Sequence, residues 1–252
     1  MANVLTENVK TLIVNTGNIL SFNDITKNPG QNPSEELEEA IKLTISNNHV
    51  SNLAAEETNL ITSKHNDLVE KMSEHDLENL KIGIKIFLTT DNATYIKQAL
   101  DKAFAALNVS SVHNVIVSLY NKGTPDEQVQ KILNIWSCLE EFVNAKKVQQ
   151  IGLSDIEENG FRSVYEAVKV KPSIIQINLA TCCVVPPTLQ AFCKEHEVLL
   201  LTHSDPAEIL PSTSIFNIFD TPLNFNWAVR FLVHIKCRGV LTTKGYILSL
   251  NK

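Results

Sequence analysis

Residues 82–119, IGIKIFLTTDNATYIKQALDKAFAALNVSSVHNVIVSL, hold the pattern that decides the fold. An apolar run over residues 82–89 precedes residues 92–107, where apolar residues recur at helical spacing, and a second apolar run follows at residues 115–119. Apolar runs without alternation predict strands that are covered on both faces, as in a parallel sheet. The stretch therefore predicts a strand–helix–strand unit.

The same alternation continues to the C-terminus. Further strands are predicted at residues 148–153, 174–179, 198–202 and 239–242, and further helices at residues 127–145, 157–168, 187–195 and 226–236. About eight strands in a chain of about 250 residues favour a (β/α)8 barrel of the TIM type. A doubly wound open sheet is the alternative that this pattern leaves open.

The N-terminal part is less regular. Residues 11–14 predict a strand, residues 15–18 a turn and residues 19–22 its hairpin return, and Ser34 is the predicted N-cap of a helix. Residues 47–75 are polar and poorly defined, an insertion or loop region in which only residues 66–72 predict a helix. We expect residues 1–252 to form a single barrel domain.

Composition and charge exclude several classes of protein. The net charge of −6 argues against nucleic-acid binding, because such proteins need a basic surplus to neutralise phosphate. No apolar run approaches the roughly 20 residues of a membrane span, and the N-terminus does not resemble a secretory signal. An odd number of unevenly spaced cysteines predicts reduced thiols and a cytoplasmic protein. The cysteines are Cys138, Cys182, Cys183, Cys193 and Cys237.

Motifs for phosphate binding and for a nucleophile elbow are absent from the sequence. Polar side chains follow the predicted strands, among them Ser118, Ser154 and His203, but they form no familiar catalytic set. Cys193, His196 and His203 have a spacing that suggests zinc, yet a structural zinc site normally needs four matched ligands. The sequence therefore predicts neither a catalytic nor a metal site.

Three stretches resemble the aldo-keto reductases. They are IGLSDI (residues 151–156), IIQINLATCCVVPPTLQAFCKEHEVLLLTHSDP (residues 174–206) and WAVRFLVHIKCRGVLTTKG (residues 227–245). The resemblance implies a (β/α)8 barrel of aldo-keto reductase type, a fold that binds NADP(H) and reduces carbonyls. Because the chain ends soon after the last predicted strand, the barrel is expected to be truncated at its C-terminus.

The family's catalytic Asp, Tyr, Lys and His are not matched. No Tyr precedes Tyr95, Ser118 stands where the His should end a strand, and Thr90 or Asp91 stands at the Lys position. The resemblance therefore implies that no catalytic residue remains. The alternative is an NADP(H)-dependent reductase with an altered active site, in which Tyr120 replaces the missing proton donor.

The cofactor site is eroded as well. Ser154 and Gln176 match ligands of the nicotinamide amide, and Lys244 matches the lysine that meets the cofactor's phosphate. Asp155 stands where the family has Asn, and His203 stands where a Tyr stacks on the nicotinamide. Ser154, Gln176 and Lys244 are thus vestigial cofactor-binding candidates. We expect no cofactor, with residual NADPH binding as the alternative.

A narrower family, the glutamate–cysteine ligase modifier (regulatory) subunits, resembles the chain almost from end to end. The matching pieces are TGNIL (residues 16–20), SEEL (34–37), VKP (170–172), QINLATCCVVPP (176–187), LLTHSDP (200–206), RGV (238–240) and KGYIL (244–248). The resemblance implies a non-catalytic subunit of glutathione biosynthesis that binds the ligase catalytic subunit as a heterodimer. It would improve the use of glutamate and relieve feedback inhibition by glutathione, and we expect its contact surface near residues 181–187 and 238–246.

Overall fold

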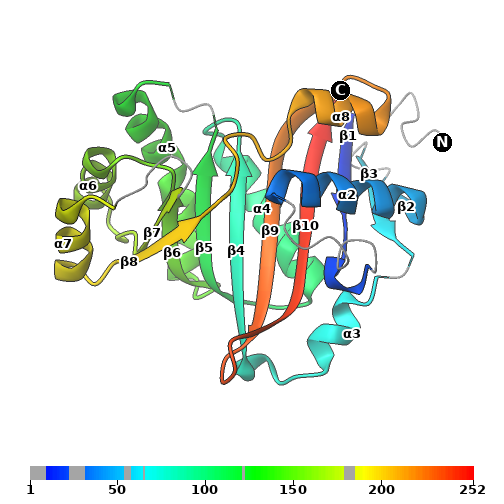
Figure 1. Ribbon diagram of the computed structural model, residues 1–252, viewed down its shortest axis with the longest axis horizontal. Coiled ribbons are helices and arrows are strands. Elements are labelled where there is room, and N and C mark those ends of the chain that lie inside the picture. The colour runs from blue at the N-terminus through cyan, green and yellow to red at the C-terminus, as the bar shows by residue number, and fades with distance from the viewer. Residues whose placement is uncertain (1–9, 23–31, 54–57, 65, 121–122, 179–184) are drawn as a thin grey trace.

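The computed structural model describes residues 10–22, 32–53, 58–64, 66–120, 123–178 and 185–252 (Figure 1). Five of its strands run parallel and lie side by side in chain order, with helices between them. The strands are β4 (Leu80–Leu88), β5 (Val112–Leu119), β6 (Val148–Ser154), β7 (Ile174–Asn178) and β8 (Leu199–His203). The helices are α4 (Ala93–Leu107), α5 (Pro125–Asn144), α6 (Glu158–Ala167) and α7 (Pro187–Glu195).

The rest of the sheet is mixed. Its strands are β1 (Thr11–Asn15), β2 (Asn48–Leu53), β3 (Thr58–Ser63), β9 (Asn224–Ile235) and β10 (Val240–Asn251). β9 and β10 form an antiparallel hairpin that joins β4 to β1, and β1 pairs with β3 in parallel. The order of the described strands is β2-β3-β1-β10-β9-β4-β5-β6-β7-β8. Shorter elements complete the fold: η1 (Ile19–Ser21), α2 (Pro33–Ser46), α3 (Leu68–Ser73), η3 (Leu77–Asn79) and α8 (Ser212–Phe219).

The two faces of the sheet carry separate hydrophobic cores. Helices α4 and α5 lie behind the sheet in Figure 1, whereas α2 and α8 lie in front of β1 and β10. The larger core includes Ile84 and Trp227 and packs beneath α4–α7. The smaller core includes Val14 and Tyr246 and packs beneath α2 and α8. Each face must bury its own apolar side chains, which explains the continuous apolar runs in the sequence.

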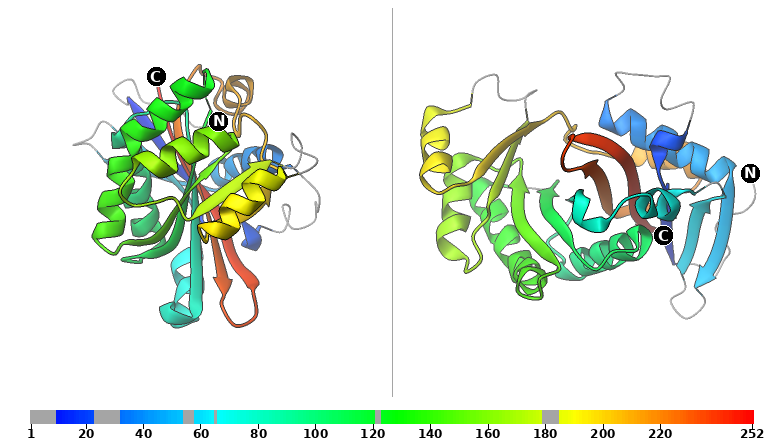
Figure 2. Two further views of the ribbon diagram at one scale, coloured as in Figure 1. Left: turned by 90° about the vertical axis from the view of Figure 1, so that its left-hand side faces the viewer. Right: turned by 90° about the horizontal axis from the view of Figure 1, so that it is seen from below.

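The α/β class is confirmed, and so is the alternation of strands and helices from β4 to β8. The described strands do not close into a hydrogen-bonded ring, because the sheet ends on β2 at one side and β8 at the other. Seen from below, the parallel strands form a curved wall with α4–α7 on its outer side (Figure 2). The inner side of this wall carries the polar side chains described below.

The helix predicted at residues 226–236 is wrong, because residues 226–235 lie in strand β9. Trp227, Val229, Phe231 and Val233 face the larger core, whereas residues between them face the other side of the sheet. Ala228 on that other side is also buried. The alternation of a strand was therefore hidden, because apolar residues occupy both faces of β9 over much of its length.

Several local predictions near the N-terminus also change. Residues 19–21 form the 3-10 turn η1 rather than a hairpin return, and the N-cap of α2 is Asn32, which accepts bonds from the backbone N–H groups of Ser34 and Glu35. Residues 47–75 are predicted as a poorly defined insertion or loop region with one possible strand within residues 47–72, and residues 48–63 include the antiparallel pair β2 and β3. The helix predicted at residues 66–72 corresponds to α3.

The turn after β1 is fastened to β10. The Thr16 backbone N–H donates to the Tyr246 carbonyl (3.0 Å), and the Tyr246 N–H donates to Thr16 Oγ1 (2.9 Å). Gly17 adopts a φ of 67°, and its carbonyl oxygen lies directly against Gly245. A Cβ at residue 245 would overlap this oxygen and the Phe231 ring, so only glycine fits there.

We expect Gly245→Ala to lower the free energy of unfolding by about 1–3 kcal/mol, the usual range for overpacking a rigid site. Urea unfolding followed by circular dichroism measures the change. Gly160→Ala is the matched control, because a Cβ at residue 160 in α6 meets only side-chain carbons, at 3.1 Å or more. A smaller loss for Gly245→Ala than for Gly160→Ala would contradict the close approach described above.

Candidate functional site

A buried lysine organises the inner face of the parallel strands. Lys85 of β4 is only 4% exposed. Its Nζ donates to Ser154 Oγ (2.8 Å), Gln176 Oε1 (2.9 Å) and Asp205 Oδ2 (2.7 Å). An ammonium group has three donors, so each has an acceptor. The lysine therefore links β4 to β6, to β7 and to the segment that follows β8.

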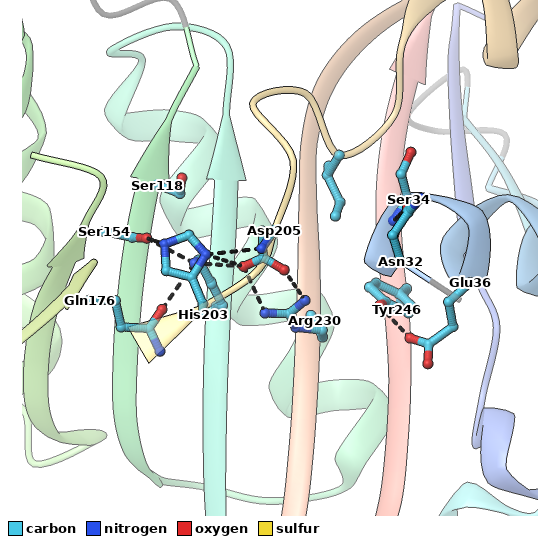
Figure 3. A network of polar contacts seen from close by, with 12 residues as sticks. Asn32, Ser34, Glu36, Ser118, Ser154, Gln176, His203, Asp205, Arg230 and Tyr246 are labelled. Atoms are coloured by element: carbon cyan, nitrogen blue, oxygen red, sulfur yellow. Dashed lines mark hydrogen bonds and ion pairs between the residues drawn. The ribbon is translucent and has the colours of Figure 1, made fainter. Parts of the chain in front are cut away.

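Asp205 lies at the centre of this network and is 3% exposed (Figure 3). The Arg230 guanidinium from β9 binds it with two nitrogens: Nη2 donates to Oδ2 at 3.0 Å, and Nη1 donates to Oδ1. Burial alone would raise the pKa of Asp205, but the bonds from His203 and Arg230 and the charge of Lys85 hold it well below its usual value. Asp205 is therefore a permanent anion between two cations.

His203, the last residue of β8, lies between two carboxylates. Its Nε2 is 3.1 Å from Asp155 Oδ1, and its Nδ1 is 3.2 Å from Asp205 Oδ2. The Asp205 backbone nitrogen is also 3.1 Å from Nδ1 and would donate to a neutral ring. Burial lowers the pKa of His203, but the two carboxylates outweigh it and raise the pKa overall, which favours the charged ring that donates to both.

Asp155 holds the other side of His203 from an unusual backbone position. It directly follows β6 and has a φ of 61°, in the left-handed region. Its carboxylate accepts from Ser154 Oγ (2.7 Å) and Ser118 Oγ (3.1 Å). Burial opposes ionisation, yet the bonds from His203 and Ser154 lower the pKa of Asp155 to about 2.

The network continues across β9 and β10 toward α2. Arg230 also interacts with the Tyr246 hydroxyl, and this hydroxyl donates to Glu36 Oε1 at 2.6 Å. The other carboxylate oxygen of Glu36 accepts from Lys244 Nζ at 2.7 Å. Figure 3 shows this second cluster beside the first. One continuous polar chain thus runs from β6 to α2 along one face of the sheet.

Ser154, His203 and Asp205 contact one another in the sequence Ser–His–Asp that a catalytic triad has. Ser154 Oγ is 3.1 Å from His203 Nε2. The surroundings do not suit a nucleophile. Ser154 is 3% exposed, and its hydroxyl accepts from Lys85 and donates to Asp155. Its proton therefore points at the Asp155 carboxylate, which is a weak base because its pKa is about 2, and the charged His203 ring cannot accept a proton. The geometry is that of an internally satisfied network.

Comparisons with known proteins supply the family. No family model matches the chain. The regulatory subunits of glutamate–cysteine ligase from Homo sapiens and Mus musculus are each 31% identical to it over 271 aligned residues. These alignments cover 100% of this chain and 96% of each relative. The chain belongs to the glutamate–cysteine ligase regulatory subunit family.

Other proteins are more distantly similar to the chain. A protein of Schizosaccharomyces pombe named a putative glutamate–cysteine ligase regulatory subunit is 28% identical, covering 50% of this chain and 46% of its own. Among solved structures, an aldo-keto reductase of the silkworm Bombyx mori is 22% identical, with a TM-score of 0.45, covering 54% of this chain and 43% of that chain. Aldose reductase from Giardia lamblia has a TM-score of 0.41 at 15% identity, covering 68% of this chain and 53% of that chain. Similarities of this size support no statement about the site.

In this member of the regulatory subunit family, the three vestigial cofactor candidates have partners within the protein. Ser154 and Gln176 meet, and both accept from Lys85, whereas Lys244 is paired with Glu36. Binding of NADPH at these residues would therefore require them to exchange these internal partners.

Tyr120, Cys193 and His196, which the sequence raised as candidates for chemistry, also have internal contacts. The Tyr120 hydroxyl accepts from the Ile209 backbone N–H, and burial raises the pKa of Tyr120 far above its usual value. Cys193 is buried, and the His196 ring packs on Phe192, with centroids 4.3 Å apart. No group of three or more His, Cys, Asp or Glu side chains among the described residues could hold a metal ion. Cys182 and Cys183 lie outside the described residues.

Sequence reasoning missed the two residues that carry the network, Lys85 and Arg230. Lys85 interrupts an otherwise apolar strand, and a single charged residue in such a run signals a buried ion pair when its partner can be identified. Arg230 was assigned to a helix, and Asp205 was not recognised as the partner of either cation. Residues 224–235 form a strand, and its register with β4 pairs Arg230 with Lys85.

We expect Lys85→Met to lower the free energy of unfolding by about 3–5 kcal/mol, because it leaves buried polar groups without their cation. Lys81→Met is the matched control, since Lys81 is on the same face of the same strand but is exposed, and its change should stay within about 0.5 kcal/mol. Urea unfolding measures both variants. Equal losses would refute the structural role of the buried ammonium.

Stability should also depend on pH through His203 and Asp155. The raised pKa of His203 contributes stability that is complete below its unfolded value of about 6.5 and is lost as pH rises through the folded value. The lowered pKa of Asp155 contributes stability that is complete above its unfolded value of about 3.9 and is lost as pH falls toward about 2. The network therefore favours a maximum of stability between these limits.

We expect His203→Gln to remove the alkaline part of this dependence. The free energy of unfolding of the unaltered chain, measured in urea at pH 5.5 and at pH 8.5, should fall more steeply with pH than that of the variant. His113→Gln serves as the control and should change the slope of stability against pH in the opposite direction, because burial and nearby lysines lower the pKa of His113. An identical slope for the unaltered chain and His203→Gln would contradict the charged state assigned to this ring.

Proposed function

We propose that the chain is a non-catalytic regulatory subunit that binds the catalytic subunit of glutamate–cysteine ligase as a heterodimer in the cytoplasm. The observation that carries this proposal is the end-to-end match to relatives that are named regulatory subunits of that ligase. The match to the human relative spans 96% of its length. Within the described residues, no helix is long and apolar enough to cross a membrane.

The chemistry of the inner face supports a non-catalytic role. Its acids and bases are bonded to one another, and its serine and lysine have no free bonding capacity. An enzyme needs such groups directed at a substrate. The reductase alternative would need Tyr120 as proton donor, and a buried tyrosine with a raised pKa is poorly suited to that role. We therefore infer that the chain uses no cofactor in its function.

The proposed effect on the ligase is a shift between two conformations of the catalytic subunit. A subunit with no active site of its own changes another protein's kinetics only by binding its states unequally. A preference for the state that holds glutamate well and glutathione poorly would improve glutamate use and relieve feedback inhibition together. Such coupling is typically about 1–3 kcal/mol, or roughly 5–150-fold in affinity.

Only some residues of the expected contact surface are exposed in the described part of the chain. Residues 181–184 lie outside the described part of the chain. Tyr246 is fully buried, so we leave it out of the proposed contact surface. The turn between β9 and β10 is exposed, and Val240 there is 50% exposed. We propose this turn, with Cys237 and Arg238, as a part of the contact surface.

We expect glutamate to tighten the complex with the catalytic subunit and glutathione to loosen it, because linkage makes the coupling reciprocal. Calorimetric titration of the chain into the catalytic subunit, with each ligand and without, gives the three dissociation constants. Equal constants would eliminate the two-state account even if the proteins bind tightly. Absence of binding would eliminate the regulatory role itself, and NADPH oxidation with standard aldehydes would support the reductase instead.

A further inference from the structure

A cavity of about 420 Å³ lies on the inner face of the sheet, between the N-terminal halves of β4 and β5 and the end of β9. Sites for small ligands commonly occupy about 300–1,000 Å³. Lys85 and Arg230 form its inner end, and Lys81, His234 and Lys236 lie at its outer end. Gln176, Leu201 and Leu232 complete much of the wall, and the lining contains no Asp or Glu.

The strand register explains why the cavity exists. Lys81, Gly83 and Lys85 alternate along β4 and so share a face, and on β9 they pair with His234, Leu232 and Arg230. The basic side chains therefore form two groups along the strands. The inner tier consists of Lys85 and Arg230, and the outer tier consists of Lys81, His234 and Lys236. Gly83 between them has no side chain, and a Cβ there would come within 2.9 Å of Asn114 Oδ1. The space between the tiers stays open because residue 83 is glycine.

The two tiers differ in how their charge is balanced. Like charges on directly opposite residues of neighbouring strands destabilise a sheet. In the inner tier, the Asp205 carboxylate binds Lys85 and Arg230 together. In the outer tier, neither Lys81 nor Lys236 makes an ion pair with any residue that the structure describes. Lys236 Nζ donates to the Glu78 backbone carbonyl (2.6 Å) rather than to its carboxylate.

The outer tier lies in a positive local field. The pKa of His234 is lowered by its burial and by the charge of Lys81. The pKa of neighbouring His113 is lowered by its burial, by Lys236 and by Lys81. Burial and, to a smaller extent, the charges of these lysines therefore favour the neutral form of both imidazoles. A bound anion would relieve this repulsion and stabilise both lysines.

We propose that the outer tier binds the phosphate or carboxylate group of a small anionic ligand, in the position that Asp205 occupies for the inner tier. Lys81 and Lys236 supply the charge, and His234 can donate once an anion raises its pKa. Leu201 and Leu232 offer an apolar surface to the rest of the ligand. Lys236 belongs to the turn that we propose as part of the contact surface, so this site is tested on the chain alone, without the catalytic subunit.

The test uses the full chain with inorganic phosphate and succinate as separate probes, at ionic strength held constant with sodium chloride. Calorimetry measures binding, and the C2 proton of His234 in NMR spectra gives its pKa. We expect saturable binding of at least one probe and a rise in the pKa of His234. The double variant Lys81→Gln/Lys236→Gln should weaken binding at least about tenfold, since it removes two charge-assisted contacts.

Two more variants distinguish binding in the cavity from attraction by the general surface charge. Lys97→Gln on the outer side of α4 removes an exposed cation elsewhere and should leave binding unchanged. Gly83→Ala keeps every charge but narrows the cavity, so it should weaken binding. Binding of phosphate alone assigns a phosphate ligand, and binding of succinate alone assigns a carboxylate. Failure of both probes to saturate, or equal binding by the double variant, would overturn the proposal.

Discussion

Burying one ammonium group in the face of a sheet sets a strict requirement, because every one of its three donors must find an acceptor. Lys85 meets the requirement only when β6, β7 and the segment after β8 all have fixed positions relative to β4. Asp205 then needs Arg230, which fixes β9 as well. A single buried charge thus aligns the parallel strands with the antiparallel hairpin.

Much of the fold follows from local patterns in the sequence. The units from β4 to β8 could be predicted because each strand is uniformly apolar and each helix has one apolar face. β9 could not, because Ala228 and Trp227 are buried on opposite faces and erase the alternation. The pairing of β1 with β10 joins residues far apart in the chain, which a local pattern does not encode. β2 and β3 are neighbours in the chain, but their residues are mostly polar and form no clear apolar run.

The candidate site shows the same division. Ser154 and Gln176 lie together because they are paired residues of neighbouring strands, and both accept from Lys85. Their role did not follow from the sequence, because a cofactor ligand and an internal hydrogen-bond partner require the same residue types at the same positions. The geometry adds the partner, because it shows both side chains accepting from Lys85.

The strand order has a consequence for how the chain is made. Among the described strands, β1 and β3 reach the rest of the sheet only through β10, which follows all the other strands in the chain. β10 must therefore leave the ribosome before the N-terminal strands can take their final positions. Until then their edges are unpaired, and such edges promote aggregation. Newly made chains should depend on chaperones until β10 has emerged, whereas β4 to β8 can assemble as they emerge.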